Sequence, residues 1–419
     1  MPSNEPTQLS KYVDLILRIG LNVRPGQRLF IAGSLTKGLD VRLAPFVRVL
    51  AAAAYDRGAT YVDVIWGDPQ LEVLRLQKAS AESLGQSPKW PAAARLEYYE
   101  AGDAVLSIHA DNPNLLAGLD PSRIAAHLGG IRAHIRPVWE YISRNAVNWC
   151  VIAVPLPEWA ATVLPDVPAS EREERLWQLI YSACRIDQPN PIASWREHIS
   201  DLSSRAVYLT TKQYACLRYS APGTDLTIGL PAGHIWNGGE ERTTHGIDFT
   251  PNLPTEEVFT SPHRMQVDGE VSSTRPFNYG GTTIDGMHLR FKEGKVVEFS
   301  AHRGEGMLRE LLQNDSGSSR LGEAALVTNS SPIARLGVTF QNVLFDENAA
   351  CHLALGDAFR SAMKDATNLS DEEFNARGGN ASKIHSDFMI GSGAMNIDGI
   401  TASGEREPIL RAGEWAFEV

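Results

Sequence analysis

The chain has 419 residues, of which 43% are hydrophobic and 21% charged, as in an ordinary folded protein large enough for two domains. It carries 39 Lys and Arg against 50 Asp and Glu, and its formal charge of -11 repels nucleic-acid phosphates and anionic membranes. We therefore expect neither a nucleic-acid partner nor a membrane partner. Residues 1–8 lack the basic and apolar regions of a secretion signal, which predicts a cytoplasmic protein.

The first half of the sequence predicts alternating helices and strands. The spacing of Tyr12, Leu15, Ile16 and Ile19 indicates an amphipathic helix, with Ser10 as its N-cap. The elements expected after it are a strand at 29–32, a helix at 47–55, strands at 60–66 and 104–109, a helix from about 121 to 144 broken at Pro137, and a strand at 149–154. This alternation predicts an α/β domain, residues 1–200, with a mainly parallel sheet.

The second half has a different texture. Two further helical segments precede Arg205, and short alternating runs follow, such as 206–210 and 226–228. Turn signals such as Gly280-Gly281 recur every few residues. We expect a domain boundary near Ser200 and a β-rich α+β domain over residues 201–419, which would contain the metal-binding site.

Familiar catalytic signatures are absent from the sequence, which has no GxxxxGK[ST] phosphate loop, no GxSxG nucleophile elbow and no HExxH zinc helix. Nucleotide-binding and serine-hydrolase functions therefore lose support. The potential metal ligands all follow the expected boundary: His385-Ser386-Asp387, Asp346-Glu347-Asn348, Cys351-His352, Gly322-Glu323 and Thr255-Glu256-Glu257.

These segments indicate a metal site only when they are taken together. If residues 384–390 form a strand, His385 and Asp387 project from the same face, because side-chain direction repeats every two residues. Taken alone, Glu323 could be a helix cap and His352 a core histidine. Two imidazoles and three carboxylates would suit two divalent ions, between which a hydroxide is nucleophilic at neutral pH.

Several longer motifs point to a known family. They are GLNVRPG at 20–26, GTDLTIGL at 223–230, PNLPTEEVFT at 251–260, DENAACHLALG at 346–356 and HSDFMIG at 385–391. In these motifs the chain resembles the aminopeptidase T and aminopeptidase S family, the thermophilic metallo-aminopeptidases, over nearly its whole length.

The resemblance implies a function and a ligand set. The implied reaction is the hydrolysis of N-terminal residues from short peptides or amino-acid amides by a hydroxide that two metal ions activate. The implied cofactors are two divalent ions per subunit, typically zinc or cobalt, with manganese and magnesium as alternatives. A homodimer is also implied. The implied ligands are Glu257, Glu323, His352, His385 and Asp387.

Two further positions bear on catalysis. Where similar enzymes carry a tyrosine seven residues beyond the ligand histidine, this chain has Phe359. The loss of a phenol that donates to the transition state would raise the activation free energy by roughly 2 to 4 kcal/mol. Phe359 therefore predicts slower peptide hydrolysis or another substrate, unless the residue at this position matters only for packing. Glu256, on the opposite face from Glu257 if this segment is extended, is a weaker candidate for the general base.

Two other functions stay open at this point. One is a non-haem iron ring-cleaving dioxygenase of the dihydroxypyridine type, whose metal triad would be His352, His385 and Asp387. Glu257 and Glu323 argue against it, because a single-iron triad does not need them. The other is a binding protein that keeps the fold without turnover.

Overall fold

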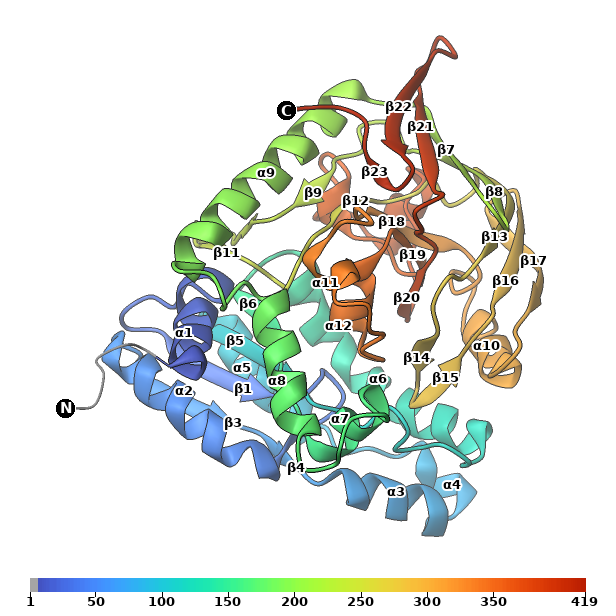
Figure 1. Ribbon diagram of the computed structural model, residues 1–419. Coiled ribbons are helices and arrows are strands. Elements are labelled where there is room, and N and C mark those ends of the chain that lie inside the picture. The colour runs from blue at the N-terminus through green and yellow to red at the C-terminus, as the bar shows by residue number, and fades with distance from the viewer. Residues whose placement is uncertain (1–6) are drawn as a thin grey trace. The chain divides into compact units, whose positions relative to one another are not determined.

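The computed structural model describes residues 7–419, which form two compact units (Figure 1). The first unit comprises residues 7–198 and Glu240–Thr255, and the second comprises Ile199–Gly239 and Glu256–Val419. Within residues 7–419, no helix is both long enough and apolar enough to cross a bilayer.

The first unit contains a four-stranded parallel sheet. Its strand order is β3 (Tyr61–Val64), β1 (Arg28–Ala32), β5 (Ala104–His109) and β6 (Trp149–Ala153). Each neighbouring pair is parallel. The predictions of a mainly parallel sheet and of strands near 29–32, 104–109 and 149–154 are therefore confirmed.

Helices lie on both faces of this sheet. On one face, Phe30 of β1 and Val105 of β5 share a hydrophobic cluster with Val138 of α6. On the other face, Tyr12 of α1 packs against aromatic rings of α2 and α8, and its hydroxyl donates to the Ala153 carbonyl of β6. The helices of this unit are α1 (Gln8–Leu15) with its π-helical extension (Ile16–Gly20), α2 (Ala44–Asp56), α3 (Pro69–Lys78), α4 (Ala81–Leu84), α5 (Trp90–Ala101), α6 (Pro121–Ser143), α7 (Pro157–Val163) and α8 (Arg172–Ala183).

Three local predictions are wrong. The N-cap of α1 is Thr7, whose hydroxyl accepts from the Ser10 N–H. Helix α6 continues through Pro137, because the proline is exposed while Ile135 and Val138 on either side of it are buried in the core. Residues 206–210, expected as a strand, belong to helix α9 (Pro191–Lys212).

The second unit is β-rich, as expected, and its strands are mainly antiparallel. Its larger sheet has the order β17 (Lys295–Ser300), β16 (His288–Lys292), β13 (Val267–Ser272), β8 (Thr224–Gly229), β7 (Cys216–Ala221), β21 (Asn396–Ile400), β22 (Arg406–Arg411) and β23 (Glu414–Trp415). Its smaller sheet has the order β20 (His385–Met389), β19 (His352–Gly356), β18 (Leu321–Leu326), β12 (Val258–Thr260) and β9 (Asn237–Gly238).

Short helical segments connect these strands. They are α10 (Glu305–Leu312), α11 (Pro332–Arg335), α12 (Val343–Asp346), the 3-10 turns η3 (Glu347–Ala349) and η4 (Arg360–Ala362), and α13 (Asp371–Ala376). Helix α12 and η3 follow each other directly, so Glu347 and Asn348 lie on one continuous helical turn just before strand β19.

The two units differ from a simple division of the sequence at residue 200. The segment Glu240–Thr255 belongs to the first unit because it runs along β6. There the Val151 N–H donates to the Pro251 carbonyl at 2.7 Å, and the Leu253 N–H donates to the Val151 carbonyl at 3.0 Å. These backbone bonds bring a piece of the second half of the sequence to the edge of the parallel sheet.

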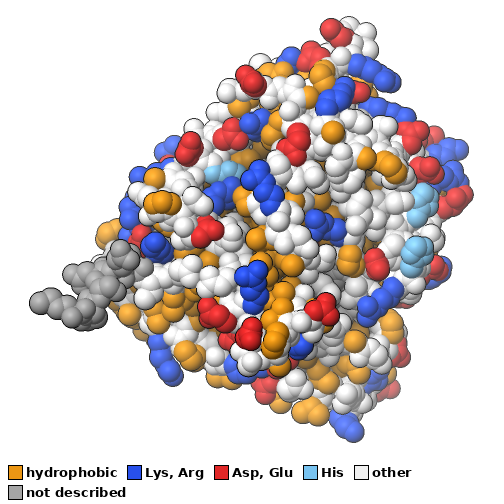
Figure 2. Space-filling view, viewed as in Figure 1, with side chains coloured by type: hydrophobic (Ala, Val, Ile, Leu, Met, Phe, Trp, Pro, Cys, Tyr) orange, Lys and Arg blue, Asp and Glu red, His pale blue; other side chains and the backbone are white. Residues whose placement is uncertain are grey.

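Charged side chains of both signs are intermingled on the face drawn in Figure 2. The excess of acidic residues over basic ones is therefore not gathered into a single region of this view.

Candidate metal centre

Strand pairing brings four of the five predicted ligands to one face of the smaller sheet. Glu323 of β18 is opposite Ala354 of β19, which is opposite Asp387 of β20. His352 lies two residues before Ala354, and His385 lies two residues before Asp387. Because side chains alternate along a strand, all four side chains point to the same side.

A glycine permits the close strand packing beside Glu323. The pairing of β18 with β19 shifts between Leu321 and Glu323, at Gly322. A Cβ atom at Gly322 would lie 2.2 Å from the Asp357 carbonyl oxygen and 2.5 Å from the Gly356 carbonyl oxygen, which are impossibly short contacts. Only glycine fits there, and the shift sets the direction of the Glu323 side chain.

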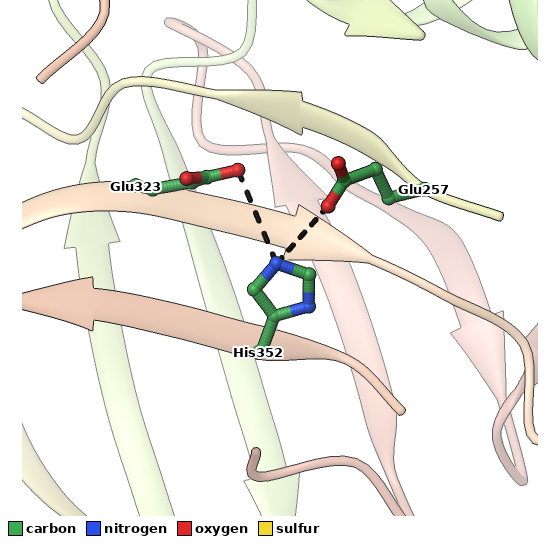
Figure 3. A group of neighbouring side chains, drawn as sticks. All are labelled: Glu257, Glu323 and His352. Atoms are coloured by element: carbon green, nitrogen blue, oxygen red, sulfur yellow. Dashed lines mark ion pairs between the residues drawn. The ribbon is translucent and has the colours of Figure 1, made fainter. Parts of the chain in front are cut away.

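Glu257, Glu323 and His352 form one group of potential ligands (Figure 3). Glu257 lies directly before β12, and its Oε2 is 3.0 Å from Nε2 of His352. Oε1 of Glu323 lies 4.0 Å from the same nitrogen. All three side chains are buried.

Glu323, His385 and Asp387 form a second group. Nε2 of His385 lies 3.0 Å from Oε2 of Glu323 and 3.3 Å from Oδ1 of Asp387. The two carboxylate oxygens of Glu323 therefore approach different imidazoles, and Glu323 is common to both groups. The structure thus brings together all five predicted ligands.

Both imidazoles turn the same nitrogen toward the carboxylates. Nδ1 of His385 is 2.7 Å from the Asp357 carbonyl oxygen, and Nδ1 of His352 is 3.3 Å from the Ala350 carbonyl oxygen. A carbonyl oxygen accepts only, so each Nδ1 must carry the proton. In the neutral ring Nε2 is then an unprotonated electron-pair donor, the arrangement found for metal-binding histidines.

The carboxylates of the cluster favour the protonated, positively charged forms of the two imidazoles. Burial by itself would lower the pKa of His352, but the carboxylate of Glu257, followed by Glu323 and Asp387, raises it to about 10. Burial would likewise lower the pKa of His385, but Asp387 and Glu323 raise it well above its ordinary value. Buried carboxylates thus hold protons on two imidazoles, and metal cations would compete for the same sites.

A further observation supports metal binding by these donors. Oε2 of Glu257 is buried, and apart from its 3.0 Å ion pair with Nε2 of His352 it has no hydrogen-bond partner within residues 7–419. A buried carboxylate oxygen held by one ion pair alone keeps part of its desolvation cost. A divalent cation bound between oxygen and nitrogen donors would remove that cost.

Glu256 and Phe359, the two other predicted site residues, lie beside the cluster. Glu256 is buried, belongs to neither ligand group, and donates its backbone N–H to the side chain of Asn348. The half-buried ring of Phe359 lies 5.1 Å from the His385 ring, edge to face, and 5.3 Å from the ring of Phe259. Its role and that of Glu256 stay predictions.

Glu347 is a buried carboxyl group near the cluster that the predicted ligand set does not include. Burial raises its pKa well above the ordinary value, with further contributions from Asp387 and Glu257. In the sequence it is one member of the Asp346-Glu347-Asn348 segment. Only its position before His352 in the DENAACH motif distinguishes it from other acidic residues.

Comparison with known proteins agrees with this picture. The family described as "Thermophilic metalloprotease (M29)" matches residues 5–415. "Aminopeptidase 2" of Geobacillus stearothermophilus is 45% identical over 412 residues, covering 98% of both chains. "Aminopeptidase AmpS" of Bacillus subtilis is 42% identical over 410 residues, again covering 98% of both chains. The solved structure of wild-type AmpT from Thermus thermophilus has a TM-score of 0.89 at 39% identity, covering 98% of this chain and 99% of that one.

The protein is thus an enzyme of the metallopeptidase class, a hydrolase. It belongs to the thermophilic metalloprotease family M29, whose relatives at 38% to 45% identity carry aminopeptidase names. The predicted resemblance to aminopeptidases T and S is confirmed.

A distant structural likeness shows the fold alone. The 2,5-dihydroxypyridine dioxygenase from Pseudomonas putida KT2440 has a TM-score of 0.50 at 13% identity, covering 98% of both chains. The dioxygenase alternative has no other support, and the family match favours the hydrolase.

Proposed function

We propose that the protein is an aminopeptidase that removes N-terminal residues from short peptides, using two divalent ions held by Glu257, Glu323, His352, His385 and Asp387. The observation that carries the proposal is the position of Glu323, whose two carboxylate oxygens approach different imidazoles. This arrangement divides five donors into two groups of three that share one carboxylate, as a paired metal centre requires.

The chemistry of the bound ions would be the usual one for such a centre. Divalent ions would lower the pKa of a water molecule and polarise the scissile carbonyl. The chain's own contribution is to fix the ligands. The Asp357 and Ala350 carbonyls orient the two imidazoles, and burial of Glu323 and His352 keeps their donor atoms in a medium of low dielectric constant.

The substrate side of the proposal follows from charge. The two bound ions would neutralise the three ligand carboxylates, so acidic side chains outside the ligand set would bind the free ammonium group of a peptide or an amino-acid amide. Glu256 is a weaker candidate for the general base. The half-buried ring of Phe359 would line the substrate side of His385 without a hydroxyl group to donate.

Zinc or cobalt are the proposed metals, with manganese or magnesium as alternatives, since imidazole and carboxylate donors suit borderline and hard divalent ions. We further propose a cytoplasmic homodimer, as the sequence resemblance implies. Light scattering on the purified protein would give its mass in solution, and a monomer would contradict the dimer without affecting the proposed chemistry.

The decisive experiment measures metal content per protomer together with turnover of aminoacyl-anilides and dipeptides. We expect two divalent ions and release of the N-terminal residue. Substrates with an acetylated N-terminus are the matched control and should not be cleaved. A single iron, no peptide cleavage and oxygen uptake with a dihydroxylated aromatic ring would instead establish a dioxygenase. Tight binding of peptides without cleavage would indicate a silent binding protein.

A further inference from the structure

We infer that Asn348 is a positioning residue for the metal centre, because its buried amide connects the backbone beside Glu257 to the turn that carries Glu347 and leads to His352. This inference rests on the proposed metal centre and adds a residue outside the ligand set.

One end of the amide holds the Glu257 segment. Asn348 is completely buried, and its Oδ1 accepts the backbone N–H of Glu256 at 2.6 Å. Glu257 follows directly in the chain and lies just before strand β12. The bond to Asn348 therefore restrains the residue next to a proposed ligand.

The other end of the amide holds its own turn. Nδ2 of Asn348 donates to the Leu344 carbonyl at 2.9 Å and lies 3.4 Å from Oε1 of Glu347. The backbone carbonyl of Asn348 accepts from the Ser331 hydroxyl at 3.0 Å. Hydrogen bonds to the side chain and to the backbone of Asn348 thus hold α12 and η3 in place.

The same turn leads to His352, which belongs to the same ligand group as Glu257. Ala350, two residues beyond Asn348, offers the carbonyl that accepts from Nδ1 of His352. Displacing the turn would move this carbonyl, and with it the direction of Nε2. Asn348 therefore acts on both sides of the 3.0 Å contact between Glu257 and His352. Partners of this kind orient ligands and contribute to metal affinity.

Asn148 in the first unit is a matched control for a general effect on stability. It is also completely buried, and its Nδ2 donates to the Leu21 carbonyl at 2.6 Å. Its Oδ1 accepts from Nε2 of Gln27 at 2.9 Å. Replacing either asparagine by alanine removes a buried amide with hydrogen bonds at both ends, so both variants should lose stability.

The experiment titrates Co²⁺ into metal-free wild type, Asn348→Ala and Asn148→Ala, following the visible absorption of the bound ion and the melting temperature of each protein. For Asn348→Ala we expect about 10- to 100-fold weaker binding and an altered Co²⁺ spectrum. For Asn148→Ala we expect the wild-type affinity and spectrum with a lower melting temperature. Unchanged binding in Asn348→Ala, or equal loss in both variants, would overturn the inference.

A second variant covers the case in which Asn348→Ala does not fold. Asn348→Ser keeps a small polar group in the space that the amide leaves, but it is too short for the direct bond to Glu256, so the same loss of affinity is expected. A wild-type protein that binds no divalent ion would remove the proposed function itself. Normal binding and turnover in wild type, with unchanged binding in the Asn348 variants, would remove only the positioning role.

Discussion

Phe359 packs edge to face with His385, at the position where the family resemblance implies a tyrosine. If a hydroxyl there donates to the developing oxyanion, Phe359→Tyr should raise kcat by up to about 100-fold, because one such donor contributes on that scale. KM should change little, since the bond forms in the transition state. Steady-state kinetics with a leucyl-anilide would measure both constants.

Phe259 offers a matched control for this substitution. Its ring is also half-buried and lies 5.3 Å from that of Phe359. Phe259→Tyr adds the same hydroxyl to the same aromatic pair and should leave kcat unchanged. Equal rates for wild type and Phe359→Tyr would show that residue 359 matters only for packing.

Asp346 should make stability depend on pH. Burial raises its pKa from 3.8 to about 7, although the Phe340 and Asn342 N–H groups donate to it. The folded protein then holds a proton that the unfolded chain releases between these pH values, so the contribution of Asp346 to stability falls as pH rises from about 4 to 7. The side chain in Asp346→Asn does not ionise, so the stability of this variant should not show this fall between pH 4 and pH 7.

The difference between the two proteins isolates this effect from other titrating groups. We expect the free energy of unfolding of Asp346→Asn, relative to wild type, to increase by a few kcal/mol at most between pH 4 and pH 7, at about 1.4 kcal/mol per pH unit. Urea unfolding at several pH values would measure it. A difference that does not vary with pH would show that Asp346 titrates normally.

Individual site residues were predictable to different degrees. The two-residue period of a strand is enough to place His385 and Asp387 on one face, and the structure agrees. Glu257, Glu323 and His352 could be selected only through the resemblance to a family, because strand pairing between distant segments brings them together. Nothing local to the sequence indicates the position of Glu347, which is buried by tertiary packing of a turn.

At the scale of elements, the β18–β19 pair depends on Gly322. In Gly322→Ala the new methyl group would overlap the Asp357 and Gly356 carbonyls, so the strands must separate and Glu323 must move. We expect a loss of stability of about 1 to 3 kcal/mol and weaker binding of divalent ions. Thermal unfolding and Co²⁺ titration would measure the two effects.

Gly306 in helix α10 is the control for that change. A Cβ atom there meets nothing within 4 Å, and alanine favours a helix over glycine by about 0.5 to 1 kcal/mol. Gly306→Ala should therefore be neutral or stabilising, with unchanged metal binding. A stable Gly322→Ala variant with wild-type metal affinity would contradict the packing argument.

The failure at residues 206–210 shows where sequence patterns mislead. Ala-Val-Tyr-Leu-Thr is rich in strand-forming residues, but Leu202, Ala206 and Leu209 are the buried positions, with helical spacing, and Val207 is 66% exposed. Tertiary packing of one face of α9 outweighs local propensity. Helices α3 and α4 are not predicted from the sequence. Each buries a single residue, Leu76 in α3 and Leu84 in α4, so neither has a wide apolar face against the core.

At the scale of the whole molecule, removing metal should lower stability. Ions that bind only the folded state stabilise it by about 2.7 kcal/mol each at a concentration 100 times their Kd. Removal also leaves three buried carboxylates with only the two protonated imidazoles to offset their charge. We expect a chelator to lower the melting temperature and added Zn²⁺ or Co²⁺ to restore it. A melting temperature insensitive to both would argue against ions bound in the folded state.

Glu323 also limits how the centre can change over evolution. Loss of Glu257 removes a donor from one group and loss of Asp387 removes a donor from the other, so either change leaves three donors intact elsewhere. Loss of Glu323 reduces both groups in a single step. Descendants of this enzyme could therefore reach a one-ion centre through Glu257 or Asp387, whereas a lineage that lost Glu323 would have no working intermediate on which selection could act.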